Sequence, residues 1–191
     1  MGKIVVSEYV SLDGVVEDPA GDEGLRVGGW VGRVGNGRED VDKIKLDEAL
    51  GADALLLGRR SYEFFAARWP SRGGELANRL NSLPKYVVSS TLRDPAWNNS
   101  KVLEQGVVTE VSRLRHDLRG NIVVYASFEL VHTLIEHDLV DELRLMIIPV
   151  VLGTGRRLFG EFSDKKAMRL VNAGTIGGAV ALLTYEPARD S

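Results

Sequence analysis

The stretch Asp53-Ala-Leu-Leu-Leu-Gly58-Arg-Arg-Ser-Tyr-Glu63 decides the predicted fold. Its first half is an apolar run without alternation, which is typical of a strand that is covered on both faces in a parallel sheet. Gly58 marks the end of this strand, and residues 59–68 have the apolar spacing of a helix. A buried strand that leads through a glycine turn into a helix predicts an α/β fold.

Strand and helix patterns alternate along most of the chain. The expected strands are residues 3–9, 53–58, 85–90, 101–103, 121–126, 141–151, 168–173 and 179–186. The expected helices are residues 39–50, 59–68, 75–83, 108–118 and 127–138. Near the C-terminus strands follow one another, and residues 174–178 have the composition of a hairpin link. This order predicts a single domain over residues 1–191, with a mainly parallel sheet whose last strands are antiparallel edge strands.

The composition is that of a soluble globular domain, with 44% apolar and 27% charged residues. The chain has no cysteine, which excludes thiolate nucleophiles, iron-sulfur clusters and cysteine-based zinc sites, and its three histidines are too scattered to predict a metal site. The net charge of −3 lacks the basic excess that nucleic-acid binding needs. No stretch approaches the roughly 20 apolar residues of a membrane span. We therefore expect a cytoplasmic protein with neither nucleic acid nor a membrane as partner.

A glycine-rich segment at residues 18–37 has neither helical nor strand periodicity. It holds seven glycines around one large aromatic residue, Trp30. Loops of this length inside a domain are usually binding or lid segments, and the alternative is a disordered surface excursion. The segment is therefore a candidate lid, with Trp30 as a candidate substrate contact.

Polar side chains follow three of the expected strands at their carboxyl ends. They are Arg59, Arg60 and Ser61 after Gly58, then Ser89, Ser90 and Thr91, and finally Ser127 after Ala126. Ligands of α/β sheets bind beyond the carboxyl ends of parallel strands, so we expect these residues to meet at one site. The guanidinium groups and hydroxyls suit a dianionic phosphate, and the helix that starts at Ser127 suits a pyrophosphate. The alternative is a set of ordinary turns, with Ser61 and Ser127 as helix caps and two solvated arginines.

Five stretches together carry a family resemblance: residues 10–17 (Val-Ser-Leu-Asp-Gly-Val-Val-Glu), 53–63, 85–92 (Lys-Tyr-Val-Val-Ser-Ser-Thr-Leu), 139–145 (Leu-Val-Asp-Glu-Leu-Arg-Leu) and 149–159 (Pro-Val-Val-Leu-Gly-Thr-Gly-Arg-Arg-Leu-Phe). The chain resembles the dihydrofolate reductase-like proteins, in particular the reductase domain of the bacterial riboflavin-pathway deaminase-reductase, over residues 3–186. The resemblance implies a three-layer fold with an eight-stranded sheet, NADPH across the strand ends, and a homodimer. The zinc deaminase domain of that enzyme has no counterpart in this sequence.

The resemblance also implies roles for individual residues. Gly58, Arg59 and Ser61 match the turn that holds cofactor phosphates in this family, and Ser89 and Ser90 match the serines around the 2′-phosphate. Asp13 and Gly14 match positions beside the nicotinamide.

Two positions depart from the family pattern. Relatives usually carry glycine at the position of Ala126 and a small residue at that of Phe128, so both side chains add bulk beside the expected pyrophosphate.

Dihydrofolate reductases place a carboxylate sixteen positions before the turn glycine, which corresponds to Asp42 here. Asp42 is therefore the candidate catalytic residue, and the alternative is an exposed helix charge.

These observations lead to one principal hypothesis and two alternatives. The principal hypothesis is an NADPH-dependent reductase that transfers hydride to a heterocyclic or ribosylamino substrate, as in reduction of 5-amino-6-(5-phosphoribosylamino)uracil in riboflavin biosynthesis. Arg156 or Arg157 is then a candidate seat for the substrate phosphate, or else a solvated turn charge. The alternatives are a dihydrofolate (pterin) reductase and a non-catalytic, dimeric nucleotide-binding module.

Overall fold

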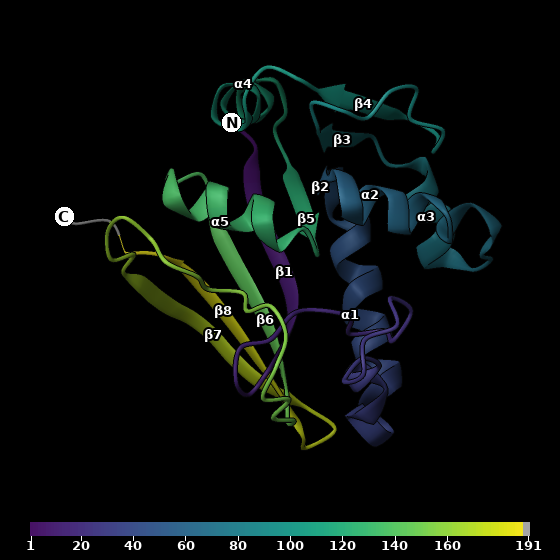
Figure 1. The fold of residues 1–191 in the computed structure, drawn as a ribbon, viewed down its shortest axis with the longest axis vertical. Coiled ribbons are helices and arrows are strands. Elements are labelled where there is room, and N and C mark those ends of the chain that lie inside the picture. The colour runs from purple at the N-terminus through teal and green to yellow at the C-terminus, as the bar shows by residue number, and fades with distance from the viewer. Residues whose placement is uncertain (189–191) are drawn as a thin grey trace.

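An eight-stranded sheet with the order β4-β3-β2-β5-β1-β6-β8-β7 forms the centre of the molecule. The computed structural model describes residues 1–188, except for the side chains of residues 33–36. Neighbouring strands are parallel throughout the part of the sheet formed by β4, β3, β2, β5, β1 and β6, and β8 and β7 add as antiparallel edge strands (Figure 1). The strands are β1 (Lys3–Ser11), β2 (Ala52–Gly58), β3 (Lys85–Val88), β4 (Ser100–Leu103), β5 (Asn121–Tyr125), β6 (Glu142–Ile148), β7 (Met168–Ile176) and β8 (Val180–Pro187). The helices are η1 (Trp30–Gly37), α1 (Arg38–Leu50), α2 (Arg59–Ala66), η2 (Trp69–Ser71), α3 (Glu75–Ser82), α4 (Val107–Asp117) and α5 (Phe128–Glu136).

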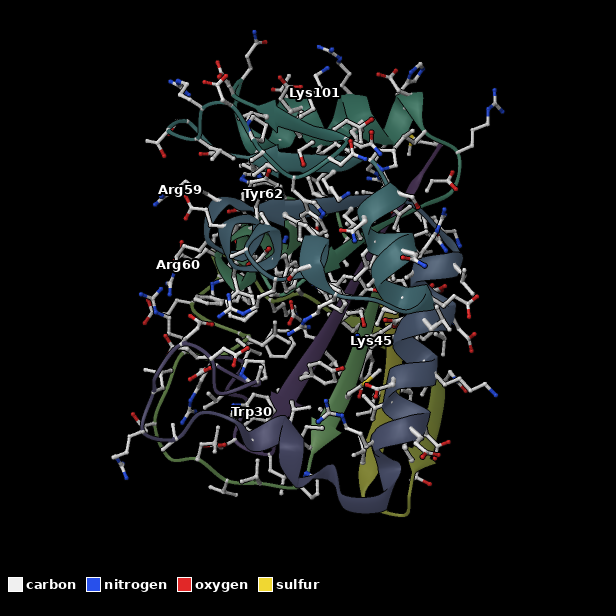
Figure 2. All side chains as sticks on the ribbon, turned by 90° about the vertical axis from the view of Figure 1, so that its right-hand side faces the viewer. Trp30, Lys45, Arg59, Arg60, Tyr62 and Lys101 are labelled. Carbon is white, nitrogen blue, oxygen red and sulfur yellow. The ribbon has the colours of Figure 1, made fainter. Side chains whose placement is uncertain are left out.

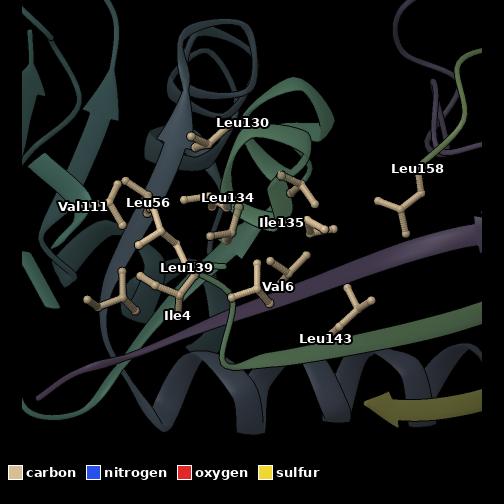
Figure 3. Close-up of a cluster of buried hydrophobic side chains, with 14 of the residues drawn as sticks. Ile4, Val6, Leu56, Val111, Leu130, Leu134, Ile135, Leu139, Leu143 and Leu158 are labelled. Carbon is tan, nitrogen blue, oxygen red and sulfur yellow. The ribbon is translucent and has the colours of Figure 1, made fainter. Parts of the chain in front are cut away.

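Helices cover both faces of the parallel strands because successive side chains of a strand point to opposite faces. On one face, Val6 of β1 and Leu56 of β2 pack against Leu134 and Ile135 of α5 (Figure 3), and α4 joins the same cluster. On the other face, buried side chains of β1, β2 and β3 pack against α1, α2 and α3. The three-layer fold, the mainly parallel sheet and the antiparallel edge strands are therefore confirmed. None of the described helices is long and apolar enough to cross a membrane.

The expected helices and strands are all present, with boundaries that differ by a few residues. Two of the differences lie where side chains or glycines turn the chain. β3 ends two residues earlier than expected, because Ser89 Oγ accepts the N–H groups of Thr91 at 3.1 Å and Leu92 at 2.9 Å and so closes a turn. β7 continues to Ile176, and the link to β8 contains two glycines with positive φ.

The segment 18–37 is not the continuous irregular loop that its composition predicts. Its second half forms η1, and Trp30 at the start of η1 is 1% exposed. The indole packs with Met146 and Ile148 of β6, and its Nε1 donates to the backbone oxygen of Glu17 at 2.9 Å. This buried aromatic fixes the start of η1 to the sheet, and a lid role for the segment stays a prediction.

The sheet divides between β2 and β5, and this division positions the site. Within the described residues, the pairing of the two strands ends at Leu55 and Val123. β2 then continues beside β3, and β5 continues beside β1. Gly58 at the end of β2 donates its N–H to Ser127 Oγ at 3.0 Å across the gap. β1 in turn pairs with β5 only as far as Ser7 and with β6 as far as Ser11, which leaves one edge of β1 open on the same side.

Candidate functional site

A cavity of about 900 Å³ lies at the carboxyl ends of the parallel strands, where the sheet divides. It has two ends. The arginine end consists of Gly58, Arg59, Arg60, Ser61, Ser89, Ser90, Thr91, Ala126 and Ser127. The tyrosine end consists of Ser7, Glu8, Tyr9, Lys45 and Tyr125. A second cavity of about 360 Å³, between α1 and strands β6 and β8, contains none of the residues predicted for the site.

The arginine end brings together all three strand ends that the sequence predicts. Ala126 and Ser127 have φ values of 51° and 63°, so the chain makes a left-handed turn between β5 and α5. This turn directs Ser127 Oγ to the Gly58 N–H and to the backbone oxygen of Tyr125. Ser127 therefore does not cap α5 through its side chain, in contrast to the alternative interpretation. The N–H groups in the first turn of α5 accordingly receive no hydrogen bond from the Ser127 side chain.

The two arginines already have carboxylate partners. Arg59 lies 3.2 Å from Glu63 on the next turn of α2, and Arg60 lies 3.4 Å from Glu23 of the glycine-rich segment. Both guanidinium groups extend outward from α2 (Figure 2), and about half of each side chain is exposed. Such exposed pairs contribute little to stability, so an incoming phosphate can replace the carboxylates at small cost. Arg59 and Arg60 can therefore serve as anion ligands.

Hydroxyl groups complete the arginine end. Ser89 is buried and uses its oxygen as the acceptor of the turn after β3, whereas Ser90 and Thr91 are exposed at the cavity. Ser61 lies inside the first turn of α2, which begins after Gly58, so it is not the helix cap of the alternative interpretation. Ser90 and Thr91 are therefore the exposed hydroxyls at this end, and Ser89 holds them in place, its Oγ also lying 3.5 Å from Thr91 Oγ1.

The tyrosine end is a buried network of charges. Lys45 Nζ lies 2.6 Å from Ser7 Oγ and 3.0 Å from Glu48 Oε2, and it also lies over the rings of Tyr9 and Tyr125 at 5.0 Å and 4.9 Å from their centroids. Burial and the nearby Glu48 carboxylate raise the pKa of both tyrosines, so both phenols stay neutral at physiological pH.

Glu8 and Tyr125 both carry a buried oxygen without a hydrogen-bond partner among the described residues: Glu8 Oε1 and the Tyr125 hydroxyl. Glu8 is 5% exposed. Burial raises the pKa of Glu8 well above its ordinary value; the positive charge of Lys45 acts in the opposite direction, and Glu48 adds to the increase.

The candidate catalytic residue Asp42 lies at the edge of the cavity rather than inside it. Its side chain is 63% exposed, and its carboxylate lies 3.7 Å from Arg38 on the previous turn of α1. The geometry therefore agrees with the alternative of an exposed helix charge.

Asp13, Gly14 and Trp30 are absent from the described residues that line the cavity. Asp13 accepts hydrogen bonds from Ser11 Oγ at 2.7 Å and from the backbone of Leu152 and Gly153, which fixes the turn after β1 to a neighbouring loop. Trp30 was expected over the substrate, and its burial beneath η1 contradicts this expectation.

Sequence reasoning missed Glu8, Lys45 and Tyr125 as site residues. A signal for Glu8 is present in the sequence, because it is a carboxylate within a strand whose other residues are mostly apolar. Lys45 is one of several charges on an amphipathic helix and has no distinguishing pattern. Its role depends on α1 crossing β1, which only the tertiary structure shows.

Residues 2–182 match the family model of the RibD C-terminal domain. The chain belongs to this family. Among curated proteins, the uncharacterized protein YyaP of Bacillus subtilis (strain 168) is 28% identical over 195 residues, covering 96% of this chain and 94% of YyaP. Membership of the RibD C-terminal domain family confirms the resemblance noted in the sequence.

Solved structures support the same fold. A protein from Shewanella sp. PV-4, assigned by its name to riboflavin biosynthesis, aligns with a TM-score of 0.77 at 21% identity, over 98% of this chain and 99% of that one. Dihydrofolate reductase from Enterococcus faecalis, in complex with NADP(H), aligns with a TM-score of 0.63 at 15% identity, over 98% and 97% of the two chains. The RibD C-terminal domain of this protein thus has the dihydrofolate reductase-like fold.

Proposed function

We propose that the protein is an NADPH-dependent reductase that transfers hydride to a polarised carbon of a heterocyclic or ribosylamino substrate. The observation that supports this most directly is the meeting of the three predicted strand ends at one cavity of about 900 Å³. A cavity of this size lies at the upper end of the range for small-molecule sites and suits a dinucleotide together with a substrate.

The residues of the arginine end fit the phosphates of NADPH. Arg59, Arg60, Ser90 and Thr91 offer guanidinium and hydroxyl donors for the 2′-phosphate. The uncapped N–H groups at the start of α5 offer donors and a positive dipole end for the pyrophosphate. NADPH supplies the hydride when it is bound.

The tyrosine end would hold the substrate. Its charged groups are largely buried, it carries two neutral phenols, and Lys45 is neutralised by Glu48. The residues there can orient a flat, uncharged ring beside Tyr9, Lys45 and Tyr125 and keep water away from the reacting atoms. A substrate phosphate would extend toward the mouth of the cavity. Neither Arg156 nor Arg157 is among the described residues that line the cavity, so neither is placed to take it.

The pterin alternative receives less support from this geometry. A pterin reductase of the ordinary type needs a partly buried carboxylate at the position of Asp42, and that side chain is 63% exposed. We therefore propose a substrate of the ribosylaminouracil class in preference to dihydrofolate.

Calorimetric titration with NADPH and NADH, at one salt concentration, tests the cofactor part of this proposal. We expect NADPH to bind at least tenfold more tightly than NADH, a difference of about 1.4 kcal/mol. In Arg59→Gln this preference should fall, because the 2′-phosphate loses a charged donor. Arg113→Gln is the control, since Arg113 is an exposed arginine that pairs with Asp117 on the next turn of α4, outside the lining of the cavity. An unchanged preference in Arg59→Gln would contradict the proposed clamp.

A turnover assay separates the reductase from the non-catalytic module. NADPH oxidation coupled to formation of reduced product supports the reductase. Tight NADPH binding without turnover of any pyrimidine or pterin substrate would favour the module. The homodimer is also a proposal, which light scattering of the purified protein tests.

A further inference from the structure

Strand β7 forms one edge of the sheet, and no described strand pairs with its outer side. Its hydrogen-bonded neighbour is β8, so the N–H and C=O groups that point away from β8 have no strand beside them. β7 is nine residues long and lies at the outside of the sheet in Figure 1, whereas the strand at the opposite edge, β4, has four residues. A long open edge is a template for pairing with another chain, and soluble proteins usually keep such edges short or block them.

The side chains of β7 are open to solvent on both faces of the sheet. Every residue from Arg169 to Thr175 is exposed, and the exposed fractions of Leu170 and Val171 are 49% and 39%. Successive side chains of a strand point to opposite faces, so neither face of this stretch is covered by the described part of the chain. The open backbone groups of the edge are therefore accompanied by exposed apolar surface.

β7 lacks most of the features that keep an edge strand from pairing. Residues 170–176 contain no charged side chain and no proline. Arg169, at the start of the strand, pairs with Glu186 of β8 at 2.7 Å. A bulge at residue 171 interrupts the pairing with β8, but residues 172–176 pair with β8 in regular register. Two copies of this edge can therefore approach each other without like charges between them.

A second copy of this chain is the partner that fits the edge. A strand edge is complementary to itself in the antiparallel orientation, because N–H groups of each copy then meet C=O groups of the other about a two-fold axis. β7 and β8 contribute nine and eight residues, which approaches the roughly 20 residues a side at the lower end for a stable interface. Such a contact uses β7 once in each copy, so assembly ends at two copies.

We propose that β7 is the interface between two copies of this chain, paired antiparallel about a two-fold axis near the middle of the strand. This inference goes beyond the proposed homodimer because it names the surface and the orientation, and it does not depend on the reductase function. None of the described residues of β7 or β8 lines the cavity of about 900 Å³. The interface therefore lies outside the described lining of that cavity.

Sedimentation velocity of the purified protein tests the surface with a charge placed beside the axis. We expect the wild type at micromolar concentration to have twice the mass of one chain. Val171→Lys should raise the dissociation constant roughly 100-fold or more, because two like charges then meet across the interface. Val108→Lys is the matched control, since Val108 lies on α4 and is 37% exposed, against 39% for Val171, and it should leave the dimer intact.

Three results of this measurement would overturn the proposal. They are a monomeric wild type, an unchanged dissociation constant in Val171→Lys, and species that keep growing with concentration, since a two-fold contact closes at two copies. Both lysine variants should keep the circular dichroism spectrum of the wild type, because both side chains are exposed in the single chain.

A cysteine scan maps the axis without adding charge, and it decides the case in which Val171→Lys fails to fold. The chain contains no cysteine of its own, so each variant carries a single thiol. The variants are Val171→Cys, Asn172→Cys, Ala173→Cys, Gly174→Cys and Thr175→Cys. A residue beside the axis faces its own copy at about 4.5–5.5 Å between Cα atoms, which is within the reach of a disulfide.

After mild oxidation we expect disulfide-linked dimers at one or two neighbouring positions, with less crosslinking on both sides of them and none in Val108→Cys. A dimeric wild type without crosslinking at any of the five positions would place the homodimer on another surface and overturn this inference alone. A monomeric wild type would contradict the homodimer as well, so the two failures can be told apart.

Discussion

Replacing Ala126 by glycine should stabilise the protein and widen the arginine end of the cavity. Ala126 has a φ of 51°, in the left-handed region, and it lies in the cavity wall between β5 and α5. An L-residue with a Cβ is destabilised in this conformation by roughly 1–2 kcal/mol. Glycine adopts it freely, and the family resemblance implies glycine at this position.

The size of the effect follows from two opposing contributions. Glycine removes the left-handed strain, but it also gives the unfolded chain more freedom, which lowers stability by about 0.4–1 kcal/mol. The net gain is about 1 kcal/mol. For a chain of this length, such a gain raises Tm by roughly 2–4 °C.

Urea unfolding followed by circular dichroism measures the difference between Ala126→Gly and the wild type. Ala77→Gly is the matched control, because Ala77 is a buried residue of α3 with ordinary helical geometry, and it should lower stability by about 1 kcal/mol or more. The two substitutions should therefore have opposite signs. Loss of stability in Ala126→Gly would refute the left-handed turn. NADPH affinity should also rise in Ala126→Gly, because the methyl group no longer occupies the cavity wall.

Three further predictions concern stability. Trp30→Ala should lower the free energy of unfolding by about 3–5 kcal/mol in urea, because the indole is 1% exposed; a change below about 1 kcal/mol would contradict its burial. Hydrogen bonds from Ser11 and from the backbone of Leu152 and Gly153 lower the pKa of Asp13 to about 2, so the stabilisation present above its ordinary value of 3.8 should be lost as pH falls toward 2, and Asp13→Asn should flatten this acid-side dependence in unfolding measurements. Burial lowers the pKa of Lys85 to about 8, so the unfolded chain binds more protons above that pH, and wild-type stability should rise from pH 8 to 10 relative to Lys85→Met; a parallel pH dependence of the two proteins would contradict it.

The sequence predicted those parts of the molecule that depend on local pattern. The apolar runs of β2 and β5 predict parallel strands, and because the carboxyl ends of parallel strands meet at one edge, the sequence alone predicts that Gly58, Ser89 and Ala126 lie at the same cavity. The family resemblance added the number of strands and the cofactor hypothesis.

The sequence did not predict contacts between side chains that lie far apart in the chain. Lys45 contacts Ser7, which lies 38 positions away in the chain. The absence of a described hydrogen-bond partner for Glu8 Oε1 likewise depends on the tertiary structure. Trp30 was misassigned because an aromatic residue among glycines has the same pattern whether it covers a ligand or anchors a loop. Burial decides between the two, and a single sequence does not show burial.

The division between β2 and β5 leaves the sheet in two parts that are joined only by a short stretch of strand pairing. Strands β4, β3 and β2 form one part, and the other five strands form the second. The pairing between the two parts ends at Leu55 and Val123, and beyond it the Gly58 N–H donates a hydrogen bond to Ser127 Oγ across the gap. A ligand that touches both Arg59 and the start of α5 would span the opening like a clamp. Such a ligand would hold the two parts of the sheet together, so the rate of hydrogen exchange at the Gly58 amide should fall when the cavity is occupied.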